Sequence, residues 1–316
     1  MPRVIRVRPP AARWPFDLLR LVFEATLRDA LPPEEPEILR FLAGFGWRFE
    51  ERLTVMRGRL MAEEARRCFD ANVRTASAIV REANDLALQA RMERLVLPRL
   101  SHAQMDAIVR VEGTLSTPAL LLFPHAGNVD LLVAAVAQRW PGLVVFTGRD
   151  PAVSADGARL TPFAREVLRR REEDRARLPI RWEPDAAALP GWLARGHLVA
   201  AAFDDRAWPT FVRTPFLGRE ALLSPDPFAL ARAAGVPIVP ATIRRERDKT
   251  SRLMIGPPTP PDLGAYVRDH ATPFLRTYPG HYARWLAECR RREGQDDHPL
   301  FTDYADDGRW RRWPVA

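Results

Sequence analysis

Apolar and polar positions divide the chain into a helical first third and a remainder in which strand-like and helix-like segments alternate. Residues 13–30 and 37–49 show helical periodicity, and residues 59–97 lack proline, which predicts one long helix or two consecutive ones. The amphipathic segment 13–30 would pack onto the core or, less commonly, lie on a membrane surface. We therefore expect a helical segment over residues 1–100, which would be membrane-proximal in the less common of the two cases.

After Pro98 the pattern changes to short apolar runs separated by helical stretches. Strands are expected at residues 108–111, 119–123, 143–146, 197–203, 236–243 and 252–255, and helices at 129–138, 161–177, 185–195, 227–234 and 282–292. This alternation predicts an α/β domain over residues 101–295, with a mostly parallel central sheet flanked by helices. Residues 296–316 are expected to form a polar tail.

One junction between a buried strand and a helix carries several polar residues. The apolar run 119–123 is followed by His125-Ala-Gly-Asn-Val-Asp130 and then by a helix. If Asn128 caps that helix, Asp130 lies in its first turn, where a carboxylate is favoured and can reach back to His125. Asp130 would then hold one imidazole nitrogen and leave the other to act as a general base. The alternative is that Asp130 is only a favourable first-turn acid.

Two further strands are also followed by polar residues. Arg149 comes after the run 143–146, and Asp204-Asp205-Arg206 comes after the run 197–203. Because the carboxyl ends of parallel strands share one edge of the sheet, we expect His125, Arg149 and Asp204 to converge there. A solvated loop is the alternative interpretation of residues 204–206.

A third candidate is Phe216-Leu-Gly-Arg219. Gly218 would permit a close backbone approach, and Arg219 would supply a contact for an anion. A plain surface turn is the alternative.

Charge and composition narrow the class of partner. The 316 residues include 48 basic and 40 acidic ones, for a net charge of +8, and Lys249 is the sole lysine. A basic, arginine-rich protein favours anionic lipid surfaces, nucleic acid or phosphorylated substrates, although codon composition alone explains such a bias equally well. Cys68 and Cys289 lie far apart in the sequence, without the spacing of a disulfide framework or a metal site. This favours a protein of the reducing cytoplasm. The sequence shows no evident secretory signal and no transmembrane run. It also shows no phosphate-binding glycine loop and no metal motif, so we expect no metal and no cofactor.

The polar clusters occur in an ordered set that resembles a known family. The set comprises His125 to Asp130, Arg149-Asp-Pro-Ala, Asp204-Asp205, Pro215-Phe-Leu-Gly-Arg219, Gly235-Val-Pro-Ile-Val-Pro240, and Trp285-Leu with Arg290. In order and approximate spacing it is similar to the late (lauroyl or myristoyl) acyltransferases of bacterial lipid A biosynthesis. They form a branch of the lysophospholipid acyltransferase superfamily that also contains phosphatidylinositol mannoside acyltransferases. The resemblance spans roughly residues 69–292.

The resemblance implies transfer of a fatty acyl chain from a thioester, on coenzyme A or acyl carrier protein, to a hydroxyl of a glycolipid or lysophospholipid. His125 would be the general base, Asp130 its orienting acid and Asp204 a further acidic residue of the site. The resemblance also implies a peripheral protein on the cytoplasmic face of the bacterial inner membrane, in contact with anionic lipid. Substrate contacts would come from Asn128, Arg149, Asp205, Arg206, Phe216, Gly218 and Arg219.

Two other functions are open at this point. The chain departs from the family pattern at Val129, where an aromatic residue is common, and at Asp205, where a glutamine usually stands. It could therefore be a non-catalytic lipid-binding or scaffold protein of an envelope-lipid pathway. Nucleic-acid binding is suggested only by the arginine count and by no recognition motif, so we expect no nucleic-acid partner.

Overall fold

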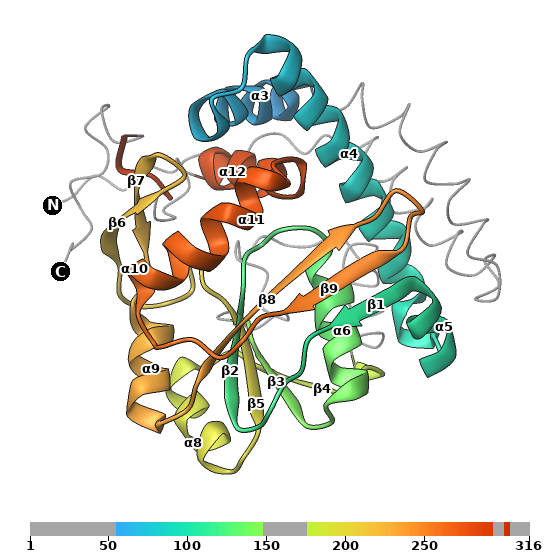
Figure 1. Ribbon diagram of the computed structural model, residues 1–316, viewed down its shortest axis with the longest axis vertical. Helices are drawn as coiled ribbons and strands as arrows, with labels where there is room; N and C mark the ends of the chain where they lie inside the picture. Colours follow the sequence, from blue (N-terminus) through green and yellow to red (C-terminus); the bar gives the residue numbers. More distant parts are fainter. Residues whose placement is uncertain (1–54, 148–175, 293–299, 304–316) are drawn as a thin grey trace, which may run out of the picture.

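The computed structural model describes residues 55–147, 176–292 and 300–303 (Figure 1). Two of the expected helices, over residues 13–30 and 37–49, lie outside the described residues. So do Arg149 and nearly all of the helix expected over residues 161–177. Within them, the expectation of an α/β fold with a mostly parallel central sheet flanked by helices is confirmed.

Seven strands form the central sheet. Their spatial order is β1 (Val109–Glu112), β9 (Ser251–Ile255), β8 (Ile238–Arg245), β2 (Ala119–Phe123), β5 (Leu198–Ala202), β3 (Leu143–Phe146) and β4 (Ile180–Glu183). Strands β8, β2, β5, β3 and β4 are mutually parallel, whereas β9 pairs antiparallel with β8 and parallel with β1. The sheet thus places the ends of β2 and β5 side by side at its centre.

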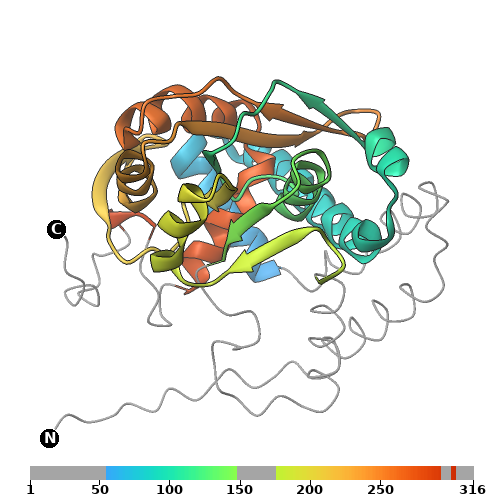
Figure 2. The same ribbon diagram turned by 90° about the horizontal axis from the view of Figure 1, so that it is seen from below.

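The central strands are buried at every position because helices cover both faces of the sheet (Figure 2). Successive side chains alternate between the faces. Leu120 and Leu122 of β2 pack towards α8 (Leu189–Ala194) and α9 (Asp226–Ala234), whereas Leu121 and Phe123 pack towards α6 (Val129–Arg139).

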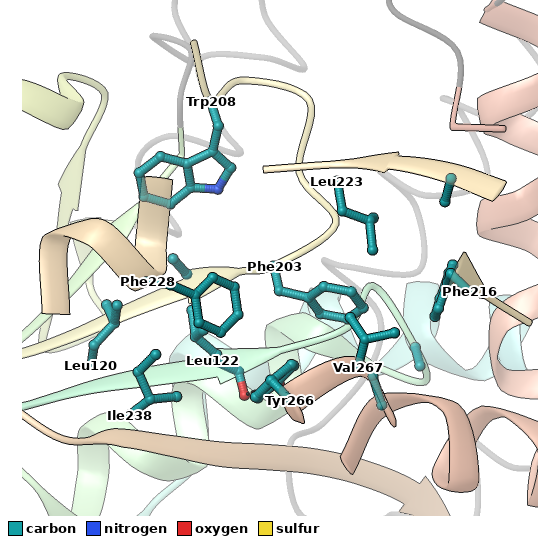
Figure 3. Close-up of a cluster of buried hydrophobic side chains, with 14 of the residues drawn as sticks. Leu120, Leu122, Phe203, Trp208, Phe216, Leu223, Phe228, Ile238, Tyr266 and Val267 are labelled. Atoms are coloured by element: carbon teal, nitrogen blue, oxygen red, sulfur yellow. Dashed lines mark hydrogen bonds between the residues drawn. The ribbon is translucent and has the colours of Figure 1, made fainter. Parts of the chain in front are cut away.

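One of these faces carries a large aromatic cluster (Figure 3). Phe203, Phe228 and Tyr266 converge there around Leu122. The hydroxyl of Tyr266 is fully buried and donates a hydrogen bond to the carbonyl of Leu122, 2.9 Å away. The cluster fixes β2 just before the chain reaches His125.

Three helices pack together beyond the sheet. They are α3 (Val55–Phe69), α4 (Val73–Val96), which Asn72 caps, and α12 (Gly280–Arg292) (Figure 1). Small side chains let the helices approach closely, among them Ala65, Ala76, Ala83, Ala283 and Ala287. The stretch without proline, residues 59–97, thus belongs to two helices, α3 and α4. Both pack on α12, the last helix of the α/β part.

The other elements complete the shell. They are η1 (Leu97–Arg99), α5 (His102–Ile108), η2 (Ala186–Ala188), the hairpin β6 (Val212–Phe216) and β7 (Arg219–Leu223), α10 (Leu263–Tyr266), the π-helical turn η3 (Val267–Ala271) and α11 (Thr272–Thr277). Strand β4, the hairpin, α5 and the helical stretch 263–277 were not expected from the sequence. Across the described ranges, no helix combines the length and apolar character needed to span a membrane.

Candidate functional site

His125 and Asp204 meet where the neighbouring strands β2 and β5 end. Phe123 pairs with Ala202 at the last position of these strands, so the two following segments lie side by side. Nδ1 of His125 is 2.9 Å from Oδ1 of Asp204. The backbone N–H of His125 also donates to this carboxylate, at 3.1 Å. The expected convergence of these two residues is confirmed.

Asp204 is held rigidly beside the imidazole. Its side chain has no solvent exposure, and the hydroxyl of Tyr282 donates to Oδ2 over 2.7 Å. Burial, together with the charge of Asp204, raises the pKa of Tyr282 well above its ordinary value, so the hydroxyl keeps its proton and remains a donor. Asp204 therefore accepts three hydrogen bonds, from the ring and backbone of His125 and from Tyr282.

These contacts set the tautomer of His125. A carboxylate has no proton to donate, so Nδ1 of His125 carries the hydrogen of the 2.9 Å contact. The lone pair of the neutral ring then lies on Nε2. His125 keeps 24% of its side-chain exposure, in contrast to the buried Asp204. The pair has the geometry of a general base whose orienting acid is shielded from solvent.

Gly127 allows the loop that carries His125 to pass close to β8 and α12. Its φ of +69° lies in the left-handed region, and a Cβ atom there would come within 2.5 Å of the carbonyl oxygen of Ile243. The backbone N–H of Gly127 donates to the carbonyl of His281 at 3.0 Å. A larger residue would push the loop, and His125 with it, away from α12.

Asn128 anchors the start of α6 and ties it to α4. Its Oδ1 accepts the N–H of Leu131 at 3.1 Å, as expected of a helix cap, and its Nδ2 donates to Oε2 of Glu93 at 2.6 Å. Glu93 also forms an ion pair with Arg245 of β8. Both ends of the Asn128 amide thus hold the loop, rather than being directed at a substrate.

Asp130 lies in the first turn of α6, as predicted, but it does not orient His125. Its Oδ2 accepts a hydrogen bond from Nε of Arg94, 2.7 Å away on α4. The carboxylate on Nδ1 of His125 is that of Asp204, which comes from the adjacent strand end. The contact with His125 that was predicted for Asp130 is therefore made by Asp204 instead.

The residues after Asp204 shape the loop. The carboxylate of Asp205 accepts the N–H of Ala207 at 2.9 Å, which is the geometry of an Asx turn. One guanidinium nitrogen of Arg206 donates to the carbonyl of Cys289 at 2.9 Å and so connects this loop to α12. Both side chains have contacts within the protein that account for their positions.

Phe216 and Gly218 belong to the fold. Phe216 is 1% exposed and packs on Tyr282 and Phe301 in the core, where a substrate could not reach it without rearrangement. Leu217 and Gly218 have φ values of +52° and +78° and form the two-residue turn of the β6–β7 hairpin. Here the structure supports the turn interpretation of this motif over the ligand interpretation.

Arg219 is neutralised inside the protein. Its side chain is 7% exposed; it donates to Glu64 at 2.8 Å and to Asp303 at 3.0 Å, and it stacks on the ring of Phe301. Glu64 is fully buried and also accepts from Arg290 at 2.9 Å. The predicted role of Arg219 in binding an anion is therefore not supported, because two protein carboxylates already occupy its guanidinium.

Three residues of this region were given no role in the site from the sequence, although Trp285 belongs to the ordered motif set. Glu93 fixes Asn128, Tyr282 binds Asp204, and Trp285 stacks on the imidazole of His125. Tyr282 and Trp285 are three positions apart on α12 and so lie on one face of the helix. This spacing of two aromatic residues was the available signal. Glu93 gave none, since charged residues are frequent throughout residues 59–97.

The described part of the chain brings together no group of three or more His, Cys, Asp or Glu side chains that could hold a metal ion. No protein-family model matches this chain, and a search of curated proteins found no match.

Proposed function

We propose that this protein is an O-acyltransferase that moves a fatty acyl chain from an acyl thioester to a hydroxyl of a glycolipid or lysophospholipid. The observation that carries the proposal is the 2.9 Å contact between Nδ1 of His125 and the buried carboxylate of Asp204. It fixes the neutral ring in the tautomer that a general base needs, at the sheet edge where open α/β proteins bind ligands.

The reaction needs one proton carrier. Nε2 of His125 takes the proton of the acceptor hydroxyl as its oxygen attacks the thioester carbonyl carbon. The C–O bond forms, and the carbonyl becomes an oxyanion. The oxyanion then collapses, the C–S bond breaks, and the thiolate takes the proton from the imidazolium, which yields an ester and a thiol. The charge of Asp204 stabilises the imidazolium between the two steps.

The substrates follow from the ordered motifs and from the charge. The motif set resembles enzymes that use acyl-CoA or acyl carrier protein as the donor. A net charge of +8 favours residence at an anionic membrane surface, where a lipid acceptor is concentrated. We place the protein as a peripheral enzyme on the cytoplasmic face of the bacterial inner membrane.

A transfer assay tests the proposal. Purified protein is incubated with radiolabelled acyl-CoA or acyl carrier protein and a panel of lysophospholipids and glycolipids, and the lipid products are separated. We expect labelled product from the intact protein and none from His125→Ala. His197→Ala is the matched control, because His197 is a partly exposed histidine just before the same strand, β5, at its opposite end.

Two results would speak against the proposal. Product formation by His125→Ala at the rate of the intact protein would remove the proposed base. Liposome binding without turnover on any acceptor of the panel would instead favour a non-catalytic lipid-binding role.

A further inference from the structure

Trp285 lies flat against the His125 ring. The centroids of the two rings are 3.8 Å apart, and their planes are inclined by 16°. Trp285 comes from α12, one helical turn after Tyr282, which donates to Asp204. One helix face therefore contacts both members of the pair: Tyr282 holds the acid, and Trp285 covers the base.

A stacked indole interacts differently with the two protonation states of an imidazole. The neutral ring gains dispersion and stacking energy, and the imidazolium gains in addition the attraction of a cation for the indole π face. Tryptophan has the strongest such face among the aromatic residues. The contact therefore favours the charged ring, which is the state that exists only after the base has taken its proton.

We propose that Trp285 is a positioning residue that fixes the ring plane of His125 and stabilises its imidazolium during proton transfer. The inference rests on the proposed function, since it concerns the same base. The imidazolium would then be stabilised from two directions. Asp204 acts in the plane of the ring, and Trp285 acts on its face.

The indole nitrogen supports a role beyond filling space. Nε1 of Trp285 is buried and has no hydrogen-bond partner among residues 55–147, 176–292 and 300–303. Two other tryptophans do donate from this atom: Nε1 of Trp208 to the carbonyl of Ala202 at 3.1 Å, and Nε1 of Trp192 to Glu183 at 3.0 Å. Burying an N–H without an acceptor is unfavourable, and a phenylalanine would fill an apolar site without that cost. The indole is therefore better explained by what its ring does to His125.

The titratable groups around His125 stay constant in a test at position 285. They include Asp204 after β5 and, on α12, the neutral hydroxyl of Tyr282, which contacts Asp204. At the start of α6 the charges are already paired, Glu93 with Arg245 and Asp130 with Arg94. A change in the titration of His125 then reports on the ring that covers it.

The test is an NMR titration of His125 in three proteins: the intact chain, Trp285→Leu and Trp285→Phe. The His125 resonance is identified by its loss in His125→Gln. Leucine keeps the apolar cover and removes the π face, so we expect a fall in the His125 pKa of about half a unit to one and a half units. Phenylalanine should give a smaller fall. Trp192→Leu, which removes a half-buried tryptophan beside His197, should leave the titration of His125 unchanged.

Kinetics add a readout that a purely structural role would not change. In Trp285→Leu we expect kcat to fall about threefold to thirtyfold with little change in KM, and the acidic limb of the pH–rate profile to move with the NMR pKa. An unchanged His125 titration in folded Trp285→Leu overturns the inference, whether or not the protein is active. Absence of transfer by the intact protein would reject the proposed function, and the titration would still decide whether Trp285 stabilises the imidazolium.

Discussion

Asp204 binds Nδ1 of His125 across 79 residues of sequence, at a distance of 2.9 Å. The nearer Asp130, in the first turn of α6, binds Arg94 instead. Asp204 and His125 thus follow the ends of two adjacent parallel strands, so the arrangement of the sheet sets the separation of their backbones. The pairing of β2 with β5 and the hydrogen bond from Tyr282 together hold the pair in place.

Loss of the Tyr282 hydroxyl should weaken both the fold and the site. Tyr282→Phe removes one of the hydrogen bonds to a fully buried carboxylate, and we expect the free energy of unfolding to fall by about 1–3 kcal/mol. Turnover should fall as well, because Asp204 gains freedom to move. Denaturant unfolding and the transfer assay measure the two effects. Tyr266→Phe is the control, since that buried hydroxyl donates to a backbone carbonyl; equal turnover losses in both variants would contradict the role of Tyr282.

Glu93 should matter for activity although it lies on α4, outside the sheet. Glu93→Gln breaks the ion pair with Arg245 and weakens the bond to Asn128, both partly buried, which we expect to cost about 1–3 kcal/mol of stability. The start of α6 should loosen, and kcat should fall. Arg213→Gln, which breaks an exposed pair with Glu220, serves as the control and should change neither quantity measurably. Wild-type stability in Glu93→Gln would show that the link is dispensable.

His281 should make the protein sensitive to acid. Burial, reinforced by Arg245 and Arg244, lowers the pKa of His281 to about 4 from the ordinary 6.5. Between these values the unfolded chain binds a proton that the native protein does not. The contribution to stability is therefore complete above pH 6.5 and is lost as the pH falls towards 4, by on the order of 3 kcal/mol in total.

A substitution isolates this contribution. Nε2 of His281 accepts the backbone N–H of Arg245 at 3.0 Å, and the amide oxygen of a glutamine could accept the same bond. Denaturant unfolding at a series of pH values should show a shallower loss of stability below pH 6.5 for His281→Gln than for the intact protein. Parallel curves for the two proteins would mean that His281 is not held neutral in the native state.

The two thiols should be inert in the native protein. Cys68 and Cys289 are both buried, and burial raises the pKa of Cys68 to about 12. The thiolate is the reactive form, so an aromatic disulfide reagent at pH 8 should label neither cysteine until the chain is unfolded, when both react. Rapid labelling before unfolding would show that the environment of these thiols opens in solution.

The central elements could be predicted because they are continuous apolar runs. Strands β2 and β3 begin and end where the sequence pattern places them, since strands buried on both faces have no polar positions to blur the limits. The β6–β7 hairpin was missed because its turn is Leu217-Gly218, whereas such turns are usually marked by asparagine or aspartate before glycine. Strand β4 is only four residues long and is not fully buried, so its pattern is weak.

The site was predictable in outline but not in its pairing. Parallel strands implied that His125 and Asp204 converge, because their carboxyl ends share an edge of the sheet. Which acid reaches Nδ1 depends on where α4 places Arg94, and no local spacing encodes that contact. The same holds for Arg219, whose partners Glu64 and Asp303 lie far away in the sequence and give no local sign of pairing.

The most direct test of the account compares Asp204→Asn with Asp130→Asn in the transfer assay. Asparagine keeps the size of the side chain but removes the charge and one acceptor oxygen. With the orienting acid at Asp204, we expect Asp204→Asn to lower kcat by a factor of about 100 to 10,000 in a folded protein. Asp130→Asn, which loses a partly exposed ion pair with Arg94, should stay within about tenfold of the intact protein. Full activity in Asp204→Asn, or an equal loss in Asp130→Asn, would contradict the His125–Asp204 pair as the catalytic unit.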